Sequence, residues 1–401
     1  MTDAIKTAGV LGLGVMGFDI AFLYAQKGYR TMVYDASEAA MQRVAERRDQ
    51  TVERLKKRNR ISDAEAESVR NRLLPMAELA DLSAADLITE AVSESAAIKK
   101  SVYQSLRDQG FTGILTTNTS SLRRASLVVG GEYADENFAT THFFNPVLHT
   151  QMVEVVRGGM ANGKYAALMG FLADLGRRPV ETKDISGFVS NSVLMVYAVM
   201  ALRLVESGAA IDAVDNAAKE LRALPPLFSF DSWKPSIVED VTRVMFEFRG
   251  DGFLRSSRLL AALAGGNPFF YVDQKPNAAI YQLVDKRGAG LDPAMVKLGL
   301  STSVRIAAAR TVELGESPAT VDFVSTEGLK FPRGPLAEID ELGADAVLRD
   351  MEKVNRALAE GGMKAPELLT ALARGGQRFF ENGQANPAIT DLVKGSLHAG
   401  H

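Results

Sequence analysis

The stretch Gly12-Leu13-Gly14-Val15-Met16-Gly17 decides the fold of the first half of this 401-residue chain. The apolar run at 8–11 stops at this stretch and predicts a buried strand. The segment 16–27 that follows has helical character, and Gly28 is well placed to end it. A strand, a G-x-G-x-x-G turn and a helix in this order are the pattern of a dinucleotide-binding unit.

Each position of the turn has a physical role in that interpretation. Gly12 permits the tight turn, Gly14 lets the backbone approach a pyrophosphate, and Gly17 lets helix and strand pack closely. Val15 and Met16 lie where the turn meets the helix, whose N-terminus meets the negative charge of the phosphates. The alternative is a plain strand–turn–helix without a ligand.

Asp35 indicates which of the two nicotinamide dinucleotides, NAD or NADP, the turn binds. It ends a second predicted strand at 29–34 and stands 18 residues beyond Gly17, near the usual spacing for an acid on the adenine ribose. A carboxylate there accepts hydrogen bonds from ribose hydroxyls and repels a 2′-phosphate, which favours NAD over NADP.

Strand and helix patterns alternate through the rest of the first half. We expect helices over 38–60 and 95–109, one starting at the capping box of Ser62 and Glu65, and strands at 87–89, 114–117 and 138–142. This order predicts an α/β Rossmann domain with a doubly wound parallel sheet over residues 1–184.

From residue 185 onward the strand signals fade and helical patterns repeat. Segment 205–208 matches 312–315 at an offset of 107, and 259–264 matches 368–373 at an offset of 109. Phe269-Phe270 matches Phe379-Phe380 at 110, after one inserted residue. We predict an all-α duplicated region, with copies over 185–287 and 288–401.

Composition excludes several classes of chemistry. The chain has no cysteine, so disulfides, thiolate metal sites and a cysteine nucleophile are ruled out, and no metal site is expected. A net charge of −3 gives no reason to expect nucleic acid as a partner. The apolar stretch 188–202 contains polar residues and predicts a buried helix, not a membrane span. We expect a cytoplasmic protein.

Two polar motifs follow strands of the predicted sheet, Thr117-Asn118-Thr119-Ser120-Ser121 and His142-Phe143-Phe144-Asn145-Pro146-Val147. Of the four histidines, only His142 stands at a predicted sheet-strand end. Since the carboxyl ends of parallel strands line one crevice, a hydroxyl and an imidazole would face the same ligand. Imidazole is the side chain best suited to exchange a proton near neutral pH.

The chain resembles the 3-hydroxyacyl-CoA dehydrogenase family over nearly its whole length. With its two helical copies it resembles the dehydrogenase portion of multifunctional fatty-acid oxidation enzymes. The resemblance rests on the glycine turn, the two polar motifs, and three further segments, Glu90-Ala91-Val92-x-Glu94, Val153-Glu154-Val155-Val156 and Gly187-Phe188-Val189-x-Asn191.

The resemblance implies a role for each matched residue. His142 would be the general base that takes the proton of the 3-hydroxyl of an acyl-CoA substrate, and Glu154 would hold its imidazole. Ser120 and Asn191 would hydrogen-bond the reacting oxygen and the substrate, in a cleft between the first domain and the first helical copy. The positions that would contact the nicotinamide half of NAD are Glu94, Lys99 and Asn145.

Departures and alternatives stay open at this point. The chain has Pro225-Pro226-Leu227-Phe228 where relatives usually carry Gly-Pro-Phe, and Gly265-Gly266 where a lysine usually precedes Gly-Phe-Tyr. One alternative is a β-hydroxyacid dehydrogenase that acts on a free acid, although such enzymes rely on a lysine that is missing near Asn191. Another is a non-catalytic NAD-binding module. Glu154 could also be an exposed strand residue.

Two further features concern partners. The basic segment 43–60 faces either coenzyme A phosphates or only solvent, and acidic residues interrupt it. Single-copy relatives pair their helical domains between subunits. Two copies in one chain could satisfy that surface internally, so we expect a monomer, with a homodimer as the alternative. The sequence leaves open the acyl chain length and the physiological direction.

Overall fold

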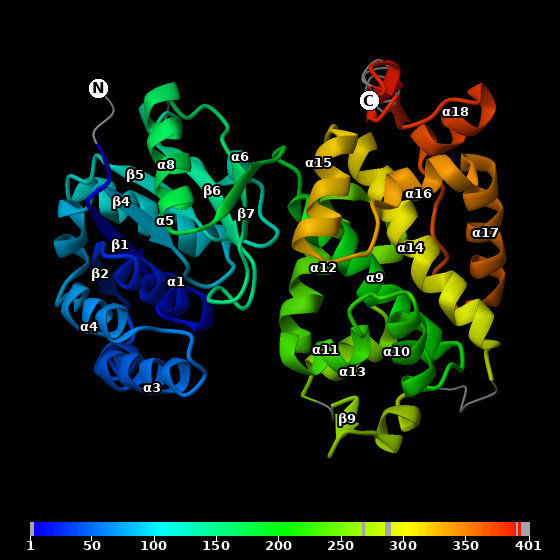
Figure 1. Ribbon diagram of the computed structural model, residues 1–401, viewed down its shortest axis with the longest axis horizontal. Coiled ribbons are helices and arrows are strands. Elements are labelled where there is room, and N and C mark those ends of the chain that lie inside the picture. Colours follow the sequence, from blue (N-terminus) through cyan, green and yellow to red (C-terminus); the bar gives the residue numbers. More distant parts are fainter. Residues whose placement is uncertain (1–3, 131, 267–268, 285–289, 390–391, 394–401) are drawn as a thin grey trace. The chain divides into compact units, whose positions relative to one another are not determined.

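The computed structural model describes residues 4–130, 132–266, 269–284, 290–389 and 392–393. The chain forms two compact units, residues 1–184 and 185–401. In Figure 1 the first unit runs from blue to green and the second from green to red.

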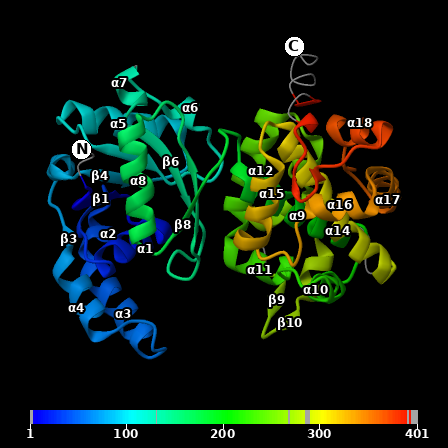
Figure 2. The ribbon, with the colours of Figure 1, turned by 45° about the horizontal axis from the view of Figure 1, so that its top comes forward.

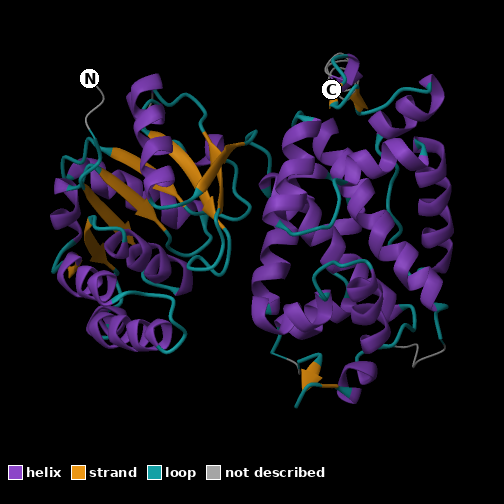
Figure 3. Cartoon of the chain, in the orientation of Figure 1, coloured by secondary structure: helices purple, strands orange, loops and turns teal. Residues whose placement is uncertain are grey.

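The first unit is built on an eight-stranded sheet in the order β3-β2-β1-β4-β5-β6-β7-β8. Its strands, orange in Figure 3, are β1 (Thr7–Leu11), β2 (Arg30–Tyr34), β3 (Leu73–Pro75), β4 (Leu87–Glu90), β5 (Ile114–Thr117), β6 (Phe138–Phe143), β7 (Met152–Val156) and β8 (Arg178–Glu181). All neighbours pair in parallel except β6 and β7. The predicted parallel sheet is therefore confirmed, with one antiparallel pair that the sequence patterns did not indicate.

Helices connect these strands. They are α1 (Val15–Gln26), α2 (Glu38–Gln42), α3 (Val44–Lys56), α4 (Asp63–Arg72), α5 (Ala96–Asp108), α6 (Arg124–Leu127), α7 (Glu132–Asp135) and α8 (Asn162–Asp174). The Ser62–Glu65 capping box is present as predicted. The single helix expected over 38–60 is wrong, because the chain breaks at Arg43. α2 buries no side chain, whereas α3 buries residues such as Val52, so packing orients α3 alone.

The second unit is helical (Figure 2). Its helices are α9 (Phe188–Glu206), α10 (Ile211–Glu220), α11 (Pro226–Trp233), α12 (Pro235–Arg249), α13 (Arg258–Ala264), α14 (Pro293–Glu313), α15 (Pro318–Phe323), α16 (Pro335–Leu342), α17 (Ala344–Ala357) and α18 (Glu367–Gly375). Two short hairpins accompany them, β9–β10 (Tyr271–Val272, Lys275–Pro276) and β11–β12 (Phe380–Glu381, Gln384–Ala385).

Helix α9 packs mainly against α14 at the centre of this unit. In the described part of the chain it is the one helix long and apolar enough to cross a membrane, but 94% of its apolar window is buried inside the protein. That burial is the behaviour of a core helix.

Hydrogen bonds repeat along the second unit. The carboxylate of Asp215 accepts the amides of residues 227 and 228, and Asp322 accepts those of residues 336 and 337. Asp231 accepts the amides of residues 270 and 271, and Asp340 those of residues 379 and 380. Each aspartate holds the start of a helix or hairpin. The repetition supports two copies of one domain, whose proposed boundary lies in 285–289, outside the described residues.

The same bonds correct one detail of the predicted repeat. Phe270 and Tyr271 occupy the positions of Phe379 and Phe380, so the offset at this point is 109, as it is between Asp231 and Asp340. The alignment of the two Phe-Phe pairs at an offset of 110 is wrong, because the aspartate fixes which amides it accepts.

We predict that Asp231→Ala and Asp340→Ala each lower the free energy of unfolding by a similar amount, about 1–3 kcal/mol, since each leaves two backbone amides without an acceptor. Chemical denaturation measures the loss. Asp240→Ala is the control, because that carboxylate is exposed and pairs with Arg243 on its own helix. A much larger loss for Asp231 than for Asp340 would contradict equivalent roles in two copies.

Candidate active site

Two glycines of the turn are required by the packing of the chain itself. Gly12 has a φ of +89°, and a Cβ there would come within 2.7 Å of the carbonyl oxygen of Ala91. A Cβ on Gly17 would lie 1.8 Å from the carbonyl oxygen of Gly12. The tight turn and the close helix–strand approach predicted for these positions are both present.

Gly14 differs, because the chain leaves space around it. A Cβ there would meet no atom within 4 Å, and its φ of −58° lies outside the left-handed region that Gly12 occupies. Gly14 precedes Val15 at the start of α1, whose first turn receives no hydrogen bond from a capping side chain. Val15 is 54% exposed, and Met16 beside it is partly buried. Open space before uncapped helical amides fits the approach of a dinucleotide phosphate.

Asp35 lies beside this turn, at the end of β2. Its Oδ2 accepts the amide of Leu13 at 2.6 Å, and its Oδ1 accepts the amide of Ser37 at 2.8 Å. These bonds fix the Asp35 side chain at the edge of the sheet where the parallel strands end. Each of its oxygens has a second lone pair that can accept a hydrogen bond from a ribose hydroxyl.

Arg47, on α3, contacts this turn, and the sequence patterns did not indicate that contact. Its Nη1 donates to the carbonyl of Leu13 at 2.6 Å, and its guanidinium lies 4.0 Å from the ring centre of Phe18. Arg47 comes from α3, in the basic segment predicted to face either coenzyme A or solvent. Other members form pairs within the chain, such as Lys56 with Asp63. Nothing in the basic pattern distinguished Arg47 from its neighbours.

His142 and Glu154 face each other across the antiparallel pair β6–β7, where they are register partners. The imidazole Nδ1 lies 2.9 Å from Oε2 of Glu154. The glutamate is 0% exposed and the histidine 7% exposed. The alternative of Glu154 as an exposed strand residue is therefore wrong. A buried carboxylate on Nδ1 fixes the orientation of the ring and directs Nε2 away from the glutamate.

The turn that carries Ser120 follows β5 directly. Glu94 holds it, because its Oε1 accepts the hydroxyl of Thr119 at 2.5 Å, the amide of Ser120 at 2.9 Å, and both the amide and hydroxyl of Ser121 at 3.1 Å. Asn118 ties this turn to β6, since its Oδ1 accepts the amide of Phe143, the neighbour of His142, at 3.0 Å. Ser120 and His142 thus belong to adjoining strand ends of one sheet.

Three other predicted residues have different surroundings. Lys99 is fully buried, with its ammonium 2.8 Å from Glu90 and 3.5 Å from Glu94, so in this structure it presents no surface to a cofactor. Asn145 is exposed in the loop after β6. Asn191 lies in the first turn of α9 in the second unit and is 8% exposed.

A glycine turn open to a dinucleotide lies at the same sheet edge as an imidazole–carboxylate pair suited to moving a proton. This combination defines the class of nicotinamide-dependent dehydrogenases. Among the described residues, no group of three or more histidine, aspartate or glutamate side chains could hold a metal ion.

Comparison with known families is more specific. The model of the NAD-binding domain of 3-hydroxyacyl-CoA dehydrogenase matches residues 7–185, and the model of the C-terminal domain of that dehydrogenase matches two stretches, 187–267 and 300–385. The chain belongs to the 3-hydroxyacyl-CoA dehydrogenase family, and NAD is its cofactor. The resemblance predicted from the motifs is confirmed.

Individual proteins show the same relationship. A 3-hydroxybutyryl-CoA dehydrogenase of Mycobacterium tuberculosis is 34% identical over 54% of this chain and 77% of its own length. The fatty acid oxidation complex subunit alpha of Pseudomonas syringae is 31% identical over 53% of this chain, but only 30% of that subunit is matched. The crystal structure of 3-hydroxybutyryl-CoA dehydrogenase from Escherichia coli shares the fold, with a TM-score of 0.74 and 22% identity over 92% of this chain and 98% of that one.

We predict that alanine has different effects at two positions of the turn, mainly on stability at Gly17 and mainly on NADH binding at Gly14. Gly17→Ala forces a Cβ against a backbone carbonyl and lowers the melting temperature by several degrees or prevents folding. Gly14→Ala lowers the melting temperature less than Gly17→Ala does, because its Cβ meets no atom of the chain. It weakens NADH binding by roughly tenfold or more, because the methyl group occupies the space open to the phosphate. Thermal melts and NADH fluorescence titration measure the two effects. Unchanged NADH affinity in Gly14→Ala would place the phosphate elsewhere.

Proposed function

We propose that the protein catalyses the NAD-dependent oxidation of an (S)-3-hydroxyacyl-CoA to the 3-oxoacyl-CoA. The observation that carries the proposal is the His142–Glu154 pair, 2.9 Å apart and buried, beside the Ser120 turn. The pair lies within the NAD-binding domain of a 3-hydroxyacyl-CoA dehydrogenase family. The names of the relatives, 3-hydroxybutyryl-CoA dehydrogenase above all, support a short acyl chain as the first substrate to test.

The mechanism assigns proton movement to His142. Nε2 takes the proton of the substrate's 3-hydroxyl while the C3 hydrogen leaves as hydride with its electron pair, and the C3–O bond becomes a carbonyl. Bound NAD supplies the acceptor of that hydride. Glu154 stabilises the imidazolium that forms, because its carboxylate lies on Nδ1.

Two polar residues are assigned to the reacting oxygen. Ser120 stands on a turn held by Glu94, so its position is fixed before substrate binds. We assign Asn191, at the start of α9 in the second unit, to the same oxygen and to the substrate. Alignment of donor and acceptor is the main task of the protein in hydride transfer.

We predict that His142→Gln reduces acetoacetyl-CoA-dependent NADH consumption by at least a hundredfold, because glutamine cannot exchange the proton. NADH affinity stays nearly intact, since His142 is not part of the glycine turn. Steady-state kinetics and NADH titration measure the two quantities. Full activity of the variant would remove His142 as the base.

A substrate comparison separates the proposal from its rivals. Turnover of acetoacetyl-CoA, with free hydroxy acids inactive, supports an acyl-CoA enzyme, whereas the reverse supports a β-hydroxyacid dehydrogenase. NADH binding without turnover on any acyl chain from C4 to C16 supports a non-catalytic module. The same scan of chain lengths identifies the preferred substrate.

We also propose that the protein is a monomer, because the two C-terminal-domain matches lie in one chain and can pair with each other. Multi-angle light scattering tests this, and a stable dimer would contradict it.

A further inference from the structure

Glu90 is a buried carboxylate to which the proposed mechanism gives no role. It is the last residue of β4 and is 0% exposed. Four donors surround it. Its Oε1 accepts the amide of Val92 at 2.6 Å and the ammonium of Lys99 at 2.8 Å. Its Oε2 accepts the hydroxyl of Tyr103 at 2.5 Å and that of Thr117 at 2.8 Å.

Stability alone is a weak reason for such a cluster. Burying two charges carries a desolvation penalty, and well-packed apolar residues often replace a buried ion pair without loss of stability. A carboxylate saturated by four donors has another physical property, since it fixes the relative positions of the groups that donate to it.

The groups that Glu90 fixes are close in the chain to the two parts of the proposed site, the dinucleotide turn and the Ser120 turn. On one side, Val92 follows Ala91, whose amide donates at 2.7 Å to the carbonyl of Leu11, the residue before Gly12 of the dinucleotide turn. On the other side, Thr117 is the last residue of β5, and the backbone carbonyl of Glu90 accepts the amide of Asn118 at 2.7 Å. The polypeptide reaches Ser120 two residues later.

A second route to Ser120 runs through charges. Lys99 bonds Glu90 and also lies 3.5 Å from Oε2 of Glu94. The other oxygen of Glu94 accepts the hydroxyl of Thr119 and the amide of Ser120. The chain of contacts from Glu90 through Lys99 to Glu94 therefore joins the end of β4 to the turn that carries Ser120, whose hydroxyl is proposed to bind substrate.

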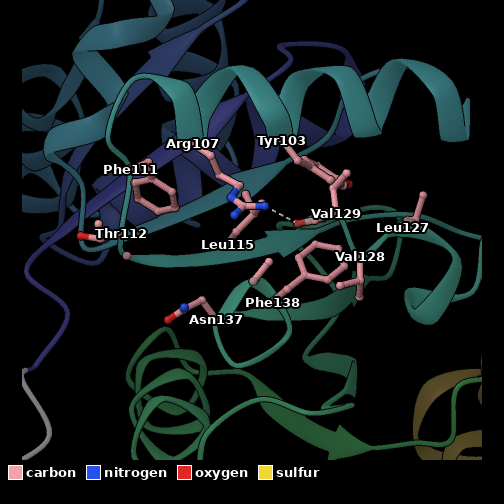
Figure 4. Close-up of a pocket in the computed structure, with 12 residues that line it drawn as sticks. Tyr103, Arg107, Phe111, Thr112, Leu115, Leu127, Val128, Val129, Asn137 and Phe138 are labelled. Carbon is pink, nitrogen blue, oxygen red and sulfur yellow. Dashed lines mark hydrogen bonds between the residues drawn. The ribbon is translucent and has the colours of Figure 1, made fainter. Parts of the chain in front are cut away.

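Tyr103 holds Glu90 from the side of α5. Its ring is 2% exposed and packs on Phe138 of β6, with ring centres 5.3 Å apart. Figure 4 shows the Tyr103 side chain reaching from α5 toward the strands, where it lines a pocket together with Arg107, which donates to the carbonyl of Val129. Burial, with the charge of Glu90 beside it, raises the pKa of Tyr103 well above its usual value. The hydroxyl therefore stays protonated and donates a hydrogen bond to Glu90.

We infer that Glu90, with Tyr103 and Lys99, is a positioning residue that sets the Ser120 turn relative to the dinucleotide turn in the reaction proposed above. None of the three side chains contacts substrate or cofactor in this role. The inference rests on the proposed function, because its readout is the rate of that reaction.

A matched pair of tyrosines tests the inference. Tyr103→Phe removes one donor from Glu90. Tyr24→Phe is the control, because Tyr24 is equally buried and donates or accepts at 2.9 Å with Thr89, the neighbour of Glu90 on β4. Both variants are expected to lower the melting temperature by a few degrees. Only Tyr103→Phe is expected to lower kcat for acetoacetyl-CoA reduction, by roughly tenfold, because the turn that carries Ser120 loses its fixed position.

Glu90→Gln extends the test, since glutamine offers one acceptor oxygen to four donors. Its kcat is expected to fall on the order of a hundredfold, measured well below its melting temperature. Should this variant fail to fold, the tyrosine pair decides alone. Unchanged kcat in Tyr103→Phe, or an equal loss in Tyr24→Phe, would overturn the inference. A wild-type protein inactive on every acyl-CoA would overturn the proposed function itself, before any variant is compared.

Discussion

Parallel pairing of four neighbouring strands is the constraint on which the rest of the site depends. In the sheet register, Leu11 of β1 is opposite Glu90 of β4, Glu90 is opposite Thr117 of β5, and Thr117 is opposite Thr140 of β6. Because the four strands run in the same direction, the residues that follow this row leave the sheet at one edge. The glycine turn, the Ser120 turn and His142 are all placed by that single row.

The one antiparallel pair of the eight-stranded sheet, β6–β7, has a separate consequence. A neighbouring strand that returned in parallel would need a long crossover before it supplied a side chain next to His142. The loop between β6 and β7 instead turns back within eight residues, 144–151, and Glu154 comes to lie directly across from His142. The two side chains meet in a dry environment, where the carboxylate acts on the imidazole with little screening by water.

Local chemistry made much of this predictable. The glycine turn was predictable from its spacing and from the strand and helix patterns on either side of it. His142 was predictable as a candidate because it is the one histidine at the end of a predicted sheet strand. Other features depend on contacts between distant segments. The burial of Lys99 is decided by Glu90 on another element, the role of Arg47 by a carbonyl in the glycine turn, and the break at Arg43 by packing of α3. A lysine that binds a cofactor and a lysine buried against a glutamate look alike in sequence.

The open space at Gly14 bears on how such a protein could change over generations. Folding alone selects for Gly12 and Gly17, since any side chain there would strike the backbone. Packing places no such demand on Gly14, where a Cβ would meet no atom of the chain within 4 Å. A descendant that lost its ligand but kept its scaffold would be free to drift at this position first. Loss of the middle glycine in a relative that keeps Gly12 and Gly17 would therefore indicate that the fold remains while dinucleotide binding has been lost.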